Sequence, residues 1–189
     1  MKVKSMKDER IICAGFGGQG IMILGKLIAY SVMEKNYNVT WMPSYGAEVR
    51  GGTAHCMVIV SDKEIASPIT SYCDTAIILN NPSMDKFHSI ISPRSVCTGR
   101  KGLALLNGSL VTKEIKRKDI DILRLPMTEI ALELGNIRAA NMVALGAYMK
   151  RRGLFVKKDV IKGIRIAFAG NKDIVDINIK ALDRGEALA

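Results

Sequence analysis

The sequence predicts an α/β fold, a three-layer domain with a mixed, largely parallel sheet and a helical C-terminal third. Up to residue 126, short runs rich in β-branched residues alternate with longer apolar segments, as strands and helices do in such folds. A glycine-rich loop joins the first of these runs to the first long segment. After residue 126 every apolar pattern has helical spacing. The length of 189 residues suits one domain spanning 1–189.

The first two strands are expected to be joined by a helix. Residues 10–14 (RIICA) predict a short buried strand, and residues 21–35 predict a mostly buried helix that stops at Asn36. The second strand covers residues 37–42. A strand, tight loop, helix and strand in about thirty residues form a βαβ unit, so these two strands should run parallel. Further strands are expected at 53–61 and 75–80.

The middle of the chain combines one clear helix with an ambiguous stretch. Residues 83–91 (SMDKFHSII) predict a helix with Ser83 as its N-cap. Residues 92–111 suggest short strands that are broken at the turn pair Asn107-Gly108. Residues 121–126 (DILRLP) should form the last strand of the sheet.

The remaining residues predict four helices. The first runs from a Thr128 cap to Gly135, and the second ends in three cationic residues followed by Gly153. The second, third and fourth cover residues 139–153, 157–170 and 173–185. Asn136 and Asn141 flank the start of the second helix, which makes capping their expected role. Met142 and Met149 fall at helical spacing and are expected in the core.

The loop GFGGQG, residues 15–20, fits the dinucleotide-binding spacing G-x-G-x-x-G. Its glycines permit positive φ and close approach of a neighbouring backbone or anion. An NAD site also needs an acidic residue at the end of the second strand, but that strand ends Val39-Thr40-Trp41-Met42-Pro43. The lysine of a phosphate-binding Walker loop is absent as well. The candidate contact residues of this loop are Gly15, Gly17, Gly18, Gln19 and Gly20.

A second motif, SYGAEVRGG at residues 44–52, follows the second strand. Because the carboxyl ends of parallel strands share one edge of a sheet, the two glycine motifs should lie side by side. One interpretation is an edge where another backbone or a cofactor comes close; the other is a structural ion pair between Glu48 and Arg50. The candidate residues of this motif are Tyr45, Glu48, Arg50, Gly51 and Gly52.

No complete catalytic set or metal site is expected in the chain. Cysteines stand at 13, 56, 73 and 97 without a C-x-x-C pair, which argues against iron–sulfur or zinc ligation, and Cys13 and Cys56 are expected as small buried hydrophobes. His55, expected in a strand, and His88, expected on a helix, form no triad with a nucleophile.

The composition favours a cytoplasmic protein without a membrane segment. The longest apolar run, residues 21–30, contains Lys26 and is too short to span a bilayer, and no secretory h-region follows the basic N-terminus. The net charge of +10 is scattered, and aromatic residues make up only 5% of the chain, which disfavours nucleic-acid binding. A basic surface would suit an acidic partner subunit or an anionic ligand.

The sequence resembles the gamma subunit of 2-oxoacid:ferredoxin oxidoreductases, the family acting on pyruvate, 2-oxoglutarate and ketoisovalerate. The resemblance rests on GFGGQGIMILGKLIA, PSYGAEVRGGTAHCMVIVSDKEIASP, DTAIILNNP and LPMTEIALELGNIRAANMVALGAY. Ala47 and Val49 replace the family's more usual proline and methionine, but Glu48 and Arg50 are kept. The last forty residues match weakly.

The resemblance implies a non-catalytic subunit of a cytoplasmic hetero-oligomer. It implies alpha and beta subunits and a ferredoxin-like delta subunit, which hold thiamine diphosphate and iron–sulfur clusters, make acyl-coenzyme A and reduce ferredoxin. The two glycine motifs would face these partners near the thiamine and coenzyme A region, and this chain alone would bind no cofactor. Isolated, it is expected to self-associate through its partner surface. The alternative left open is a free-standing, Rossmann-like oxidoreductase that binds a nucleotide or dinucleotide.

Overall fold

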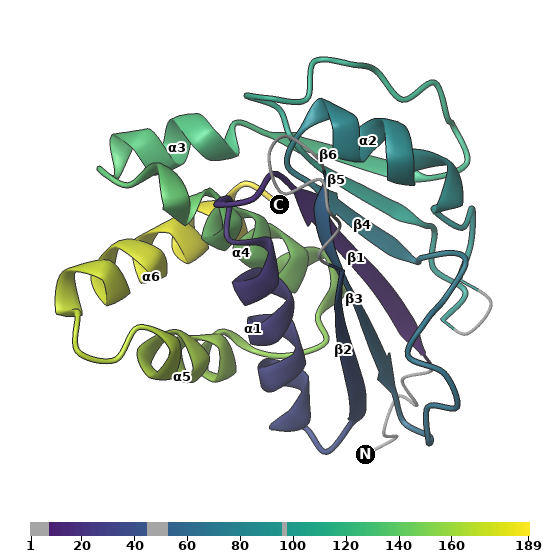
Figure 1. The fold of residues 1–189 in the computed structure, drawn as a ribbon, viewed down its shortest axis with the longest axis horizontal. Coiled ribbons are helices and arrows are strands. Elements are labelled where there is room, and N and C mark those ends of the chain that lie inside the picture. Colours follow the sequence, from purple (N-terminus) through teal and green to yellow (C-terminus); the bar gives the residue numbers. More distant parts are fainter. Residues whose placement is uncertain (1–7, 45–52, 96–97) are drawn as a thin grey trace.

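The computed structural model describes residues 8–44, 53–95 and 98–189 (Figure 1). Six strands form one sheet in the order β2-β3-β1-β4-β5-β6. Strand β3 runs antiparallel to both of its neighbours, and the other neighbouring pairs are parallel. The expected mixed, largely parallel sheet is therefore confirmed. The strands are β1 Glu9–Gly15, β2 Asn38–Ser44, β3 Ala54–Ser61, β4 Thr75–Ile78, β5 Leu103–Asn107 and β6 Asp121–Leu125.

The fold has three layers, because helices cover both faces of the sheet (Figure 1). One face packs against α1 and α3 to α6, and the other packs against α2 and the segment that joins β5 to β6. Four of the helices follow β6, so the helical C-terminal third is confirmed. The helices are α1 Ile21–Met33, α2 Asn81–Phe87, α3 Met127–Glu133, α4 Ala140–Arg152, α5 Lys157–Ala167 and α6 Lys172–Ala187, with short 3-10 turns η1 His88–Ile90 and η2 Ile137–Ala139.

The first two strands run in the same direction, as predicted, but they are not neighbours. Strand β3 lies between β1 and β2 and pairs with each of them in antiparallel register. Its insertion depends on pairing between segments far apart in the chain, which a local strand–helix–strand pattern does not encode. The adjacent parallel pair of a dinucleotide-binding unit is therefore absent from this part of the sheet.

The core has two halves because β1 is buried on both of its faces. Ile11 and Cys13 pack on the side of α1 and α4, while Ile12 and Ala14 pack on the side of α2. A strand that is covered on both faces has a continuous run of apolar residues, as Ile11 to Ala14 show. Strand β1 thus fixes the start of the glycine loop rigidly at the centre of the sheet.

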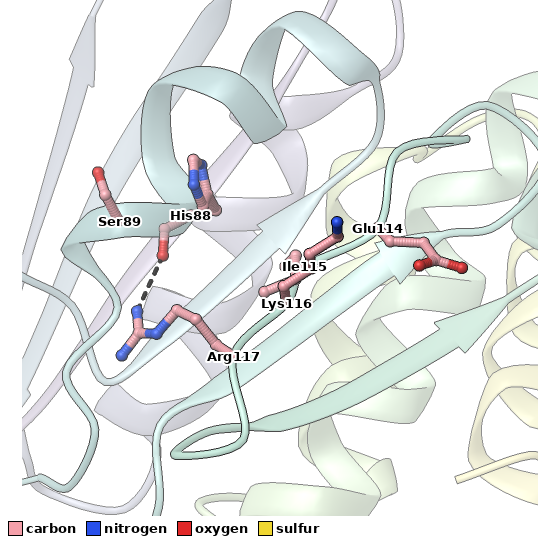
Figure 2. Close-up of a pocket in the computed structure, with 6 residues that line it drawn as sticks. All are labelled: His88, Ser89, Glu114, Ile115, Lys116 and Arg117. Carbon is pink, nitrogen blue, oxygen red and sulfur yellow. Dashed lines mark hydrogen bonds between the residues drawn. The ribbon is translucent and has the colours of Figure 1, made fainter.

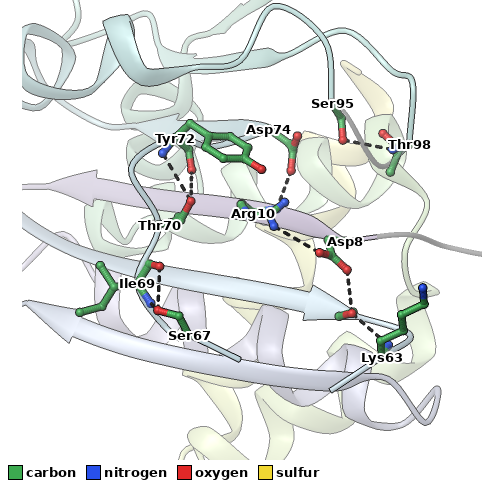
Figure 3. A network of polar contacts seen from close by, with 11 residues as sticks. Asp8, Arg10, Lys63, Ser67, Ile69, Thr70, Tyr72, Asp74, Ser95 and Thr98 are labelled. Carbon is green, nitrogen blue, oxygen red and sulfur yellow. Dashed lines mark hydrogen bonds and ion pairs between the residues drawn. The ribbon is translucent and has the colours of Figure 1, made fainter. Parts of the chain in front are cut away.

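A polar network holds the opposite end of β1 (Figure 3). The backbone N–H of Arg10 donates to the Asp74 carboxylate at 2.8 Å, and the Arg10 guanidinium contacts Asp8 at 3.2 Å. The Ser61 hydroxyl donates to the same Asp8 carboxylate at 2.7 Å. These contacts tie β1 to the end of β3 and to the start of β4.

Helix α2 begins one turn earlier than Ser83, contrary to the sequence prediction. Its N-cap is Asn80, whose side-chain oxygen accepts from the Ser83 N–H at 2.8 Å, and Pro82 occupies the first turn. The Ser83 hydroxyl is buried without a hydrogen-bond partner in the described structure. We expect Asn80→Ala to cost about 1 kcal/mol of unfolding free energy in urea titrations. Ser83→Ala should be close to neutral. A larger loss from Ser83→Ala than from Asn80→Ala would show that Ser83 is the cap.

The predicted Thr128 cap is also wrong. Helix α3 has Pro126 at its N-cap, and Thr128 lies inside the first turn. The Thr128 hydroxyl instead accepts from the side chain of Asn107, the last residue of β5, at 2.8 Å. Asn136 does cap the turn η2, by accepting from the Arg138 N–H at 3.0 Å. Thr128 therefore joins the first turn of α3 to the end of β5.

Candidate functional site at the glycine edge

The carboxyl ends of β1, β4, β5 and β6 meet at one edge of the sheet, which we call the glycine edge. It comprises the loop 15–20, Asn80, Asn107 and Thr128. The register pairs Gly15 with Ala54 and Ser44 with His55, so the first residue of the second motif and the residues that follow the motif lie at this edge as well. The candidate residues Tyr45, Glu48, Arg50, Gly51 and Gly52 themselves lie outside the described residues.

The loop between β1 and α1 is closed by its own glutamine. The Gln19 side-chain oxygen accepts from the Phe16 N–H at 2.6 Å, and the Gln19 N–H donates to the Phe16 carbonyl at 3.2 Å. Gly18 and Gly20 have φ angles of 91° and 72°, which side chains disfavour. The backbone conformation thus explains two of the glycines. A Cβ at Gly15 would also press on the Gln19 oxygen, at 2.6 Å.

Gly17 has no such explanation within the chain. Its φ is not positive, and a Cβ built on it would meet no described atom within 4 Å. The neighbouring Phe16 side chain is 37% exposed. The tip of the loop is therefore backbone without a covering side chain, and another molecule can approach it closely.

A buried asparagine from α4 holds the other end of the loop. The Asn141 amide donates to the Gly20 carbonyl at 3.0 Å, and a Cβ at Gly20 would collide with that amide. Asn141 is only 3% exposed, and its side-chain oxygen has no partner among the described residues. The predicted capping role of Asn141 is thus wrong: it lies inside α4 and anchors a loop 121 residues away.

A small cavity of about 120 Å³ opens beside the loop. Its lining includes Gly18 and Gln19 from the loop, Thr128 from α3, and Ile137 and Arg138 from η2. Pockets that enclose drug-sized ligands have about 300–1,000 Å³, so this one admits a small group and not a whole dinucleotide. The exposed Arg138 guanidinium has no acidic partner within the described ranges. Arg138 is not among the site residues predicted from the sequence, because a lone arginine has no spacing that marks a binding site.

The glycine edge is rich in amides and poor in acids and bases. Asn80 and Asn107 are 1% and 0% exposed. Their side chains form hydrogen bonds to the first turns of α2 and α3, respectively. Among the titratable side chains, His55 lies at the edge on β3, where its ring stacks on Phe87 with centroids 4.9 Å apart. Burial and the nearby Lys86 charge lower the pKa of His55, so its ring is neutral at pH 7. This arrangement suits binding better than proton transfer.

The other titratable candidates have structural surroundings. His88 begins η1, where its Nδ1 contacts the Met84 carbonyl at 2.9 Å. Cys13 and Cys56 face each other across β1 and β3, and both are fully buried, as expected. Burial raises the pKa of the third described cysteine, Cys73, so its thiol stays protonated. No cluster of potential metal ligands occurs within the described ranges, and Cys97 lies outside them.

A larger hollow of about 460 Å³ lies away from the glycine edge, between η1 and residues 114–117 (Figure 2). Its principal cation, Arg117, is already engaged. The guanidinium donates to the carbonyls of His88 and Ile91 at 3.1 and 2.8 Å and pairs with Asp119 at 2.6 Å. Arg117 therefore braces the connection between β5 and β6 and is not a free cation of this hollow.

No helix in the described part of the chain is long and apolar enough to cross a membrane.

Relatives of the chain are subunits of oxoacid oxidoreductases. It is 32% identical over 180 residues to ketoisovalerate oxidoreductase subunit VorA of Methanothermobacter marburgensis, covering 95% of this chain but only 36% of VorA. It is 29% identical over 191 residues to 2-oxoglutarate synthase subunit KorC of Methanocaldococcus jannaschii, covering 100% of this chain and 96% of KorC. The chain thus spans about a third of the first relative and nearly the whole of the second.

A solved structure shares the fold over almost its full length. The gamma subunit of a keto/oxoacid ferredoxin oxidoreductase from Geobacter sulfurreducens has a TM-score of 0.78 and 26% identity, over 96% of this chain and 98% of that one. The family model for pyruvate ferredoxin/flavodoxin oxidoreductase matches residues 10–188. The chain therefore belongs to the pyruvate ferredoxin/flavodoxin oxidoreductase family, as a homologue of its gamma subunits.

Proposed function

We propose that the chain is the gamma subunit of a 2-oxoacid:ferredoxin oxidoreductase that uses thiamine diphosphate and iron–sulfur clusters. The complex would decarboxylate a 2-oxoacid, transfer the acyl group to coenzyme A and reduce ferredoxin. Residues 1–189 would act in it as one domain. The observation that carries this proposal is a bare, exposed loop tip at Gly17, on an edge without an acid–base pair among its described residues.

The chain itself is proposed to be non-catalytic and to bind no cofactor alone. Its described residues offer neither a metal cluster nor a reactive thiol, since their cysteines are buried. Thiamine diphosphate and the clusters would belong to alpha, beta and ferredoxin-like delta subunits, which this chain would join in the cytoplasm. The neutral His55 and the amide-rich surroundings support a role in positioning other groups.

The glycine edge is the proposed contact with these subunits and with coenzyme A. Gly17 leaves room for a partner backbone, and the Arg138 guanidinium beside the 120 Å³ cavity offers charge to a phosphate. The second motif would complete this contact through Tyr45, Glu48, Arg50, Gly51 and Gly52. Similarity to KorC and VorA favours 2-oxoglutarate or a branched-chain oxoacid as the substrate of the complex.

Purification of the tagged chain from its own cells tests the proposal. We expect it to elute with larger subunits in a fraction that contains thiamine diphosphate and shows iron–sulfur absorbance. Calorimetry with NAD, FAD and coenzyme A on the isolated chain tests the competing nucleotide-enzyme function. A chain that always elutes alone and binds NAD or FAD tightly would overturn the proposal.

Removal of the second motif's cation should weaken assembly. We expect Arg50→Ala to lower incorporation into the complex, or acyl transfer, by about tenfold, because one or two charge-assisted hydrogen bonds are lost. Incorporation is measured by tag recovery, and acyl transfer by acyl-coenzyme A formation. Arg165→Ala, an exposed change on α5, is the matched control and should leave both unchanged. Equal behaviour of the two variants would remove Arg50 from the contact.

A further inference from the structure

A second candidate binding site lies at the opposite edge of the sheet, where β5 and β6 begin. A hollow of about 420 Å³ opens there beside Leu103 and Asp121, the first residues of these strands. The glycine edge lies at the other ends of the same strands. The hollow is therefore separate from the proposed partner contact, and its volume falls in the range of about 300–1,000 Å³ that small-molecule sites occupy.

Four exposed cations surround this hollow, and they come from two distant segments. Arg100 and Lys101 precede β5, whereas Lys150 and Arg151 belong to the last turn of α4. None of the four forms an ion pair with an acidic side chain in the described structure. An excess of unpaired positive charge around a concave surface concentrates anions there.

The acidic side chains of the region are fewer than these cations and offset their charge only in part. Asp121 is the acidic side chain in the lining, and the terminal residue Ala189 also contributes to it. Glu9 lies beneath the surface and pairs with Arg152 at 3.0 Å. Asp119, whose pKa is lowered chiefly by its hydrogen bond to Arg117, pairs with Arg117 at 2.6 Å.

The cations are held in place by the buried arginine behind them. Arg152 is 6% exposed, and its guanidinium donates to the Lys101 carbonyl at 3.1 Å. In return the Arg100 guanidinium donates to the Arg152 carbonyl at 2.6 Å. These reciprocal bonds fix residues 100–101 against the end of α4, so the cations of both segments converge before any ligand arrives.

A purely structural explanation does not cover the whole of this cluster. Cations in the last turn of a helix interact favourably with its dipole, which accounts for Lys150 and Arg151. The Arg100 guanidinium is explained in the same way, because it donates to the carbonyl of Arg152 at the end of α4, but Lys101 lies outside any helix and would be repelled by the α4 cations. The convergence of like charges costs free energy that a bound anion would offset.

We propose that this hollow binds a phosphate anion with at least two neighbouring negative groups, such as a diphosphate. Arginine guanidinium groups match phosphate oxygens in bidentate geometry, and lysines add point charges around them. The Arg100 guanidinium, held by α4, would form the bidentate contact with one phosphate, and Lys150 and Arg151 would contact the second phosphate. This site is independent of the glycine edge and of the complex proposed above.

Calorimetry with inorganic diphosphate on the purified full chain tests the site. We expect saturable binding that weakens about tenfold or more in Lys150→Ala/Arg151→Ala, since two charged contacts are lost. The control Arg165→Ala/Lys172→Ala removes the same residue types near the turn between α5 and α6 and should change affinity less than about twofold.

Amide chemical shifts locate the bound anion. Diphosphate should shift the backbone N–H signals of residues 100–103 and 121 and leave those of 17–20 unchanged. Three results would overturn the proposal: no binding by the wild-type chain, equal weakening in the two double variants, or shifts confined to residues 17–20. Binding of an acidic peptide without binding of diphosphate would reassign the surface to protein docking.

Discussion

Arg152→Met is expected to destabilise the folded chain by about 3–5 kcal/mol at pH 7, because it leaves a buried charge without its partner. Arg152 lies at the end of α4 and is 6% exposed, while Glu9 on β1 is 1% exposed. The guanidinium contacts Glu9 at 3.0 Å, the Thr75 hydroxyl at 2.8 Å and the Asp74 carbonyl at 2.7 Å. One side chain thus joins α4 to β1 and β4.

The loss should shrink as the pH falls. Burial raises the pKa of Glu9 above its ordinary value of 4.5, and the Arg152 charge opposes that rise. Without Arg152 the pKa of Glu9 rises further, so the carboxylate is protonated in the folded state at a higher pH. When the pKa of a carboxyl group is higher in the folded state than in the unfolded state, the fold loses stability as the pH rises through the folded-state pKa. Below the unfolded-state pKa this loss is absent. The penalty of Arg152→Met should therefore be smaller at pH 5 than at pH 7.

Urea denaturation at the two pH values measures both effects. Arg151→Met, at the exposed neighbouring position, is the matched control and should change stability by no more than about 0.5 kcal/mol. In a Glu9→Gln background, Arg152→Met should cost less than it does alone, because the orphaned carboxylate is gone. Equal losses from Arg151→Met and Arg152→Met would show that the buried pair does not hold α4 to the sheet.

Gly20→Ala should cost about 2–4 kcal/mol, which combines backbone strain with a steric collision. Gly20 has a φ of 72°, and its Cβ would run into the buried amide of Asn141. That amide donates to the Gly20 carbonyl at 3.0 Å, so the substitution also disturbs the bond that anchors the loop to α4. The effect is measured as the shift in the urea midpoint of the isolated chain.

Neighbouring glycines separate the two causes. Gly18 has a φ of 91° but open space around its Cβ position, so Gly18→Ala should show the strain alone, about 1–2 kcal/mol. In an Asn141→Ala background, Gly20→Ala should likewise lose its collision and cost about as much as Gly18→Ala. If Gly20→Ala proves no worse than Gly18→Ala in the wild-type background, the Asn141 anchor is unimportant.

The sequence predicted most of the elements because their signals are local. RIICA reads as a strand buried on both faces, and the cations and Gly153 at the end of α4 mark a helix terminus. The same locality explains the errors. The insertion of β3 between β1 and β2, and the use of Thr128 to hold Asn107, depend on contacts between residues far apart in the chain.

The candidate site was only partly predictable for the same reason. The glycine pattern indicated a tight turn, and the positive φ angles of Gly18 and Gly20 confirm that part. Local spacing predicts neither the Asn141 anchor nor the position of Arg138 beside the cavity, because each acts on a loop about 120 residues away. The sequence likewise showed Arg152 only as one of three cationic residues at the end of a helix, but its side chain turns inward to Glu9.

The central claim is that the glycine edge receives another subunit or its acyl carrier. Gly17→Val tests it most directly, since Gly17 has open space and no positive φ within the chain. The claim predicts that the isolated variant unfolds at the wild-type urea midpoint but enters the complex at least about fivefold less well, as overpacking of an interface implies. Ala169→Val, which adds similar bulk on the turn after α5, should assemble normally. Wild-type assembly and turnover of the Gly17→Val complex would contradict the claim.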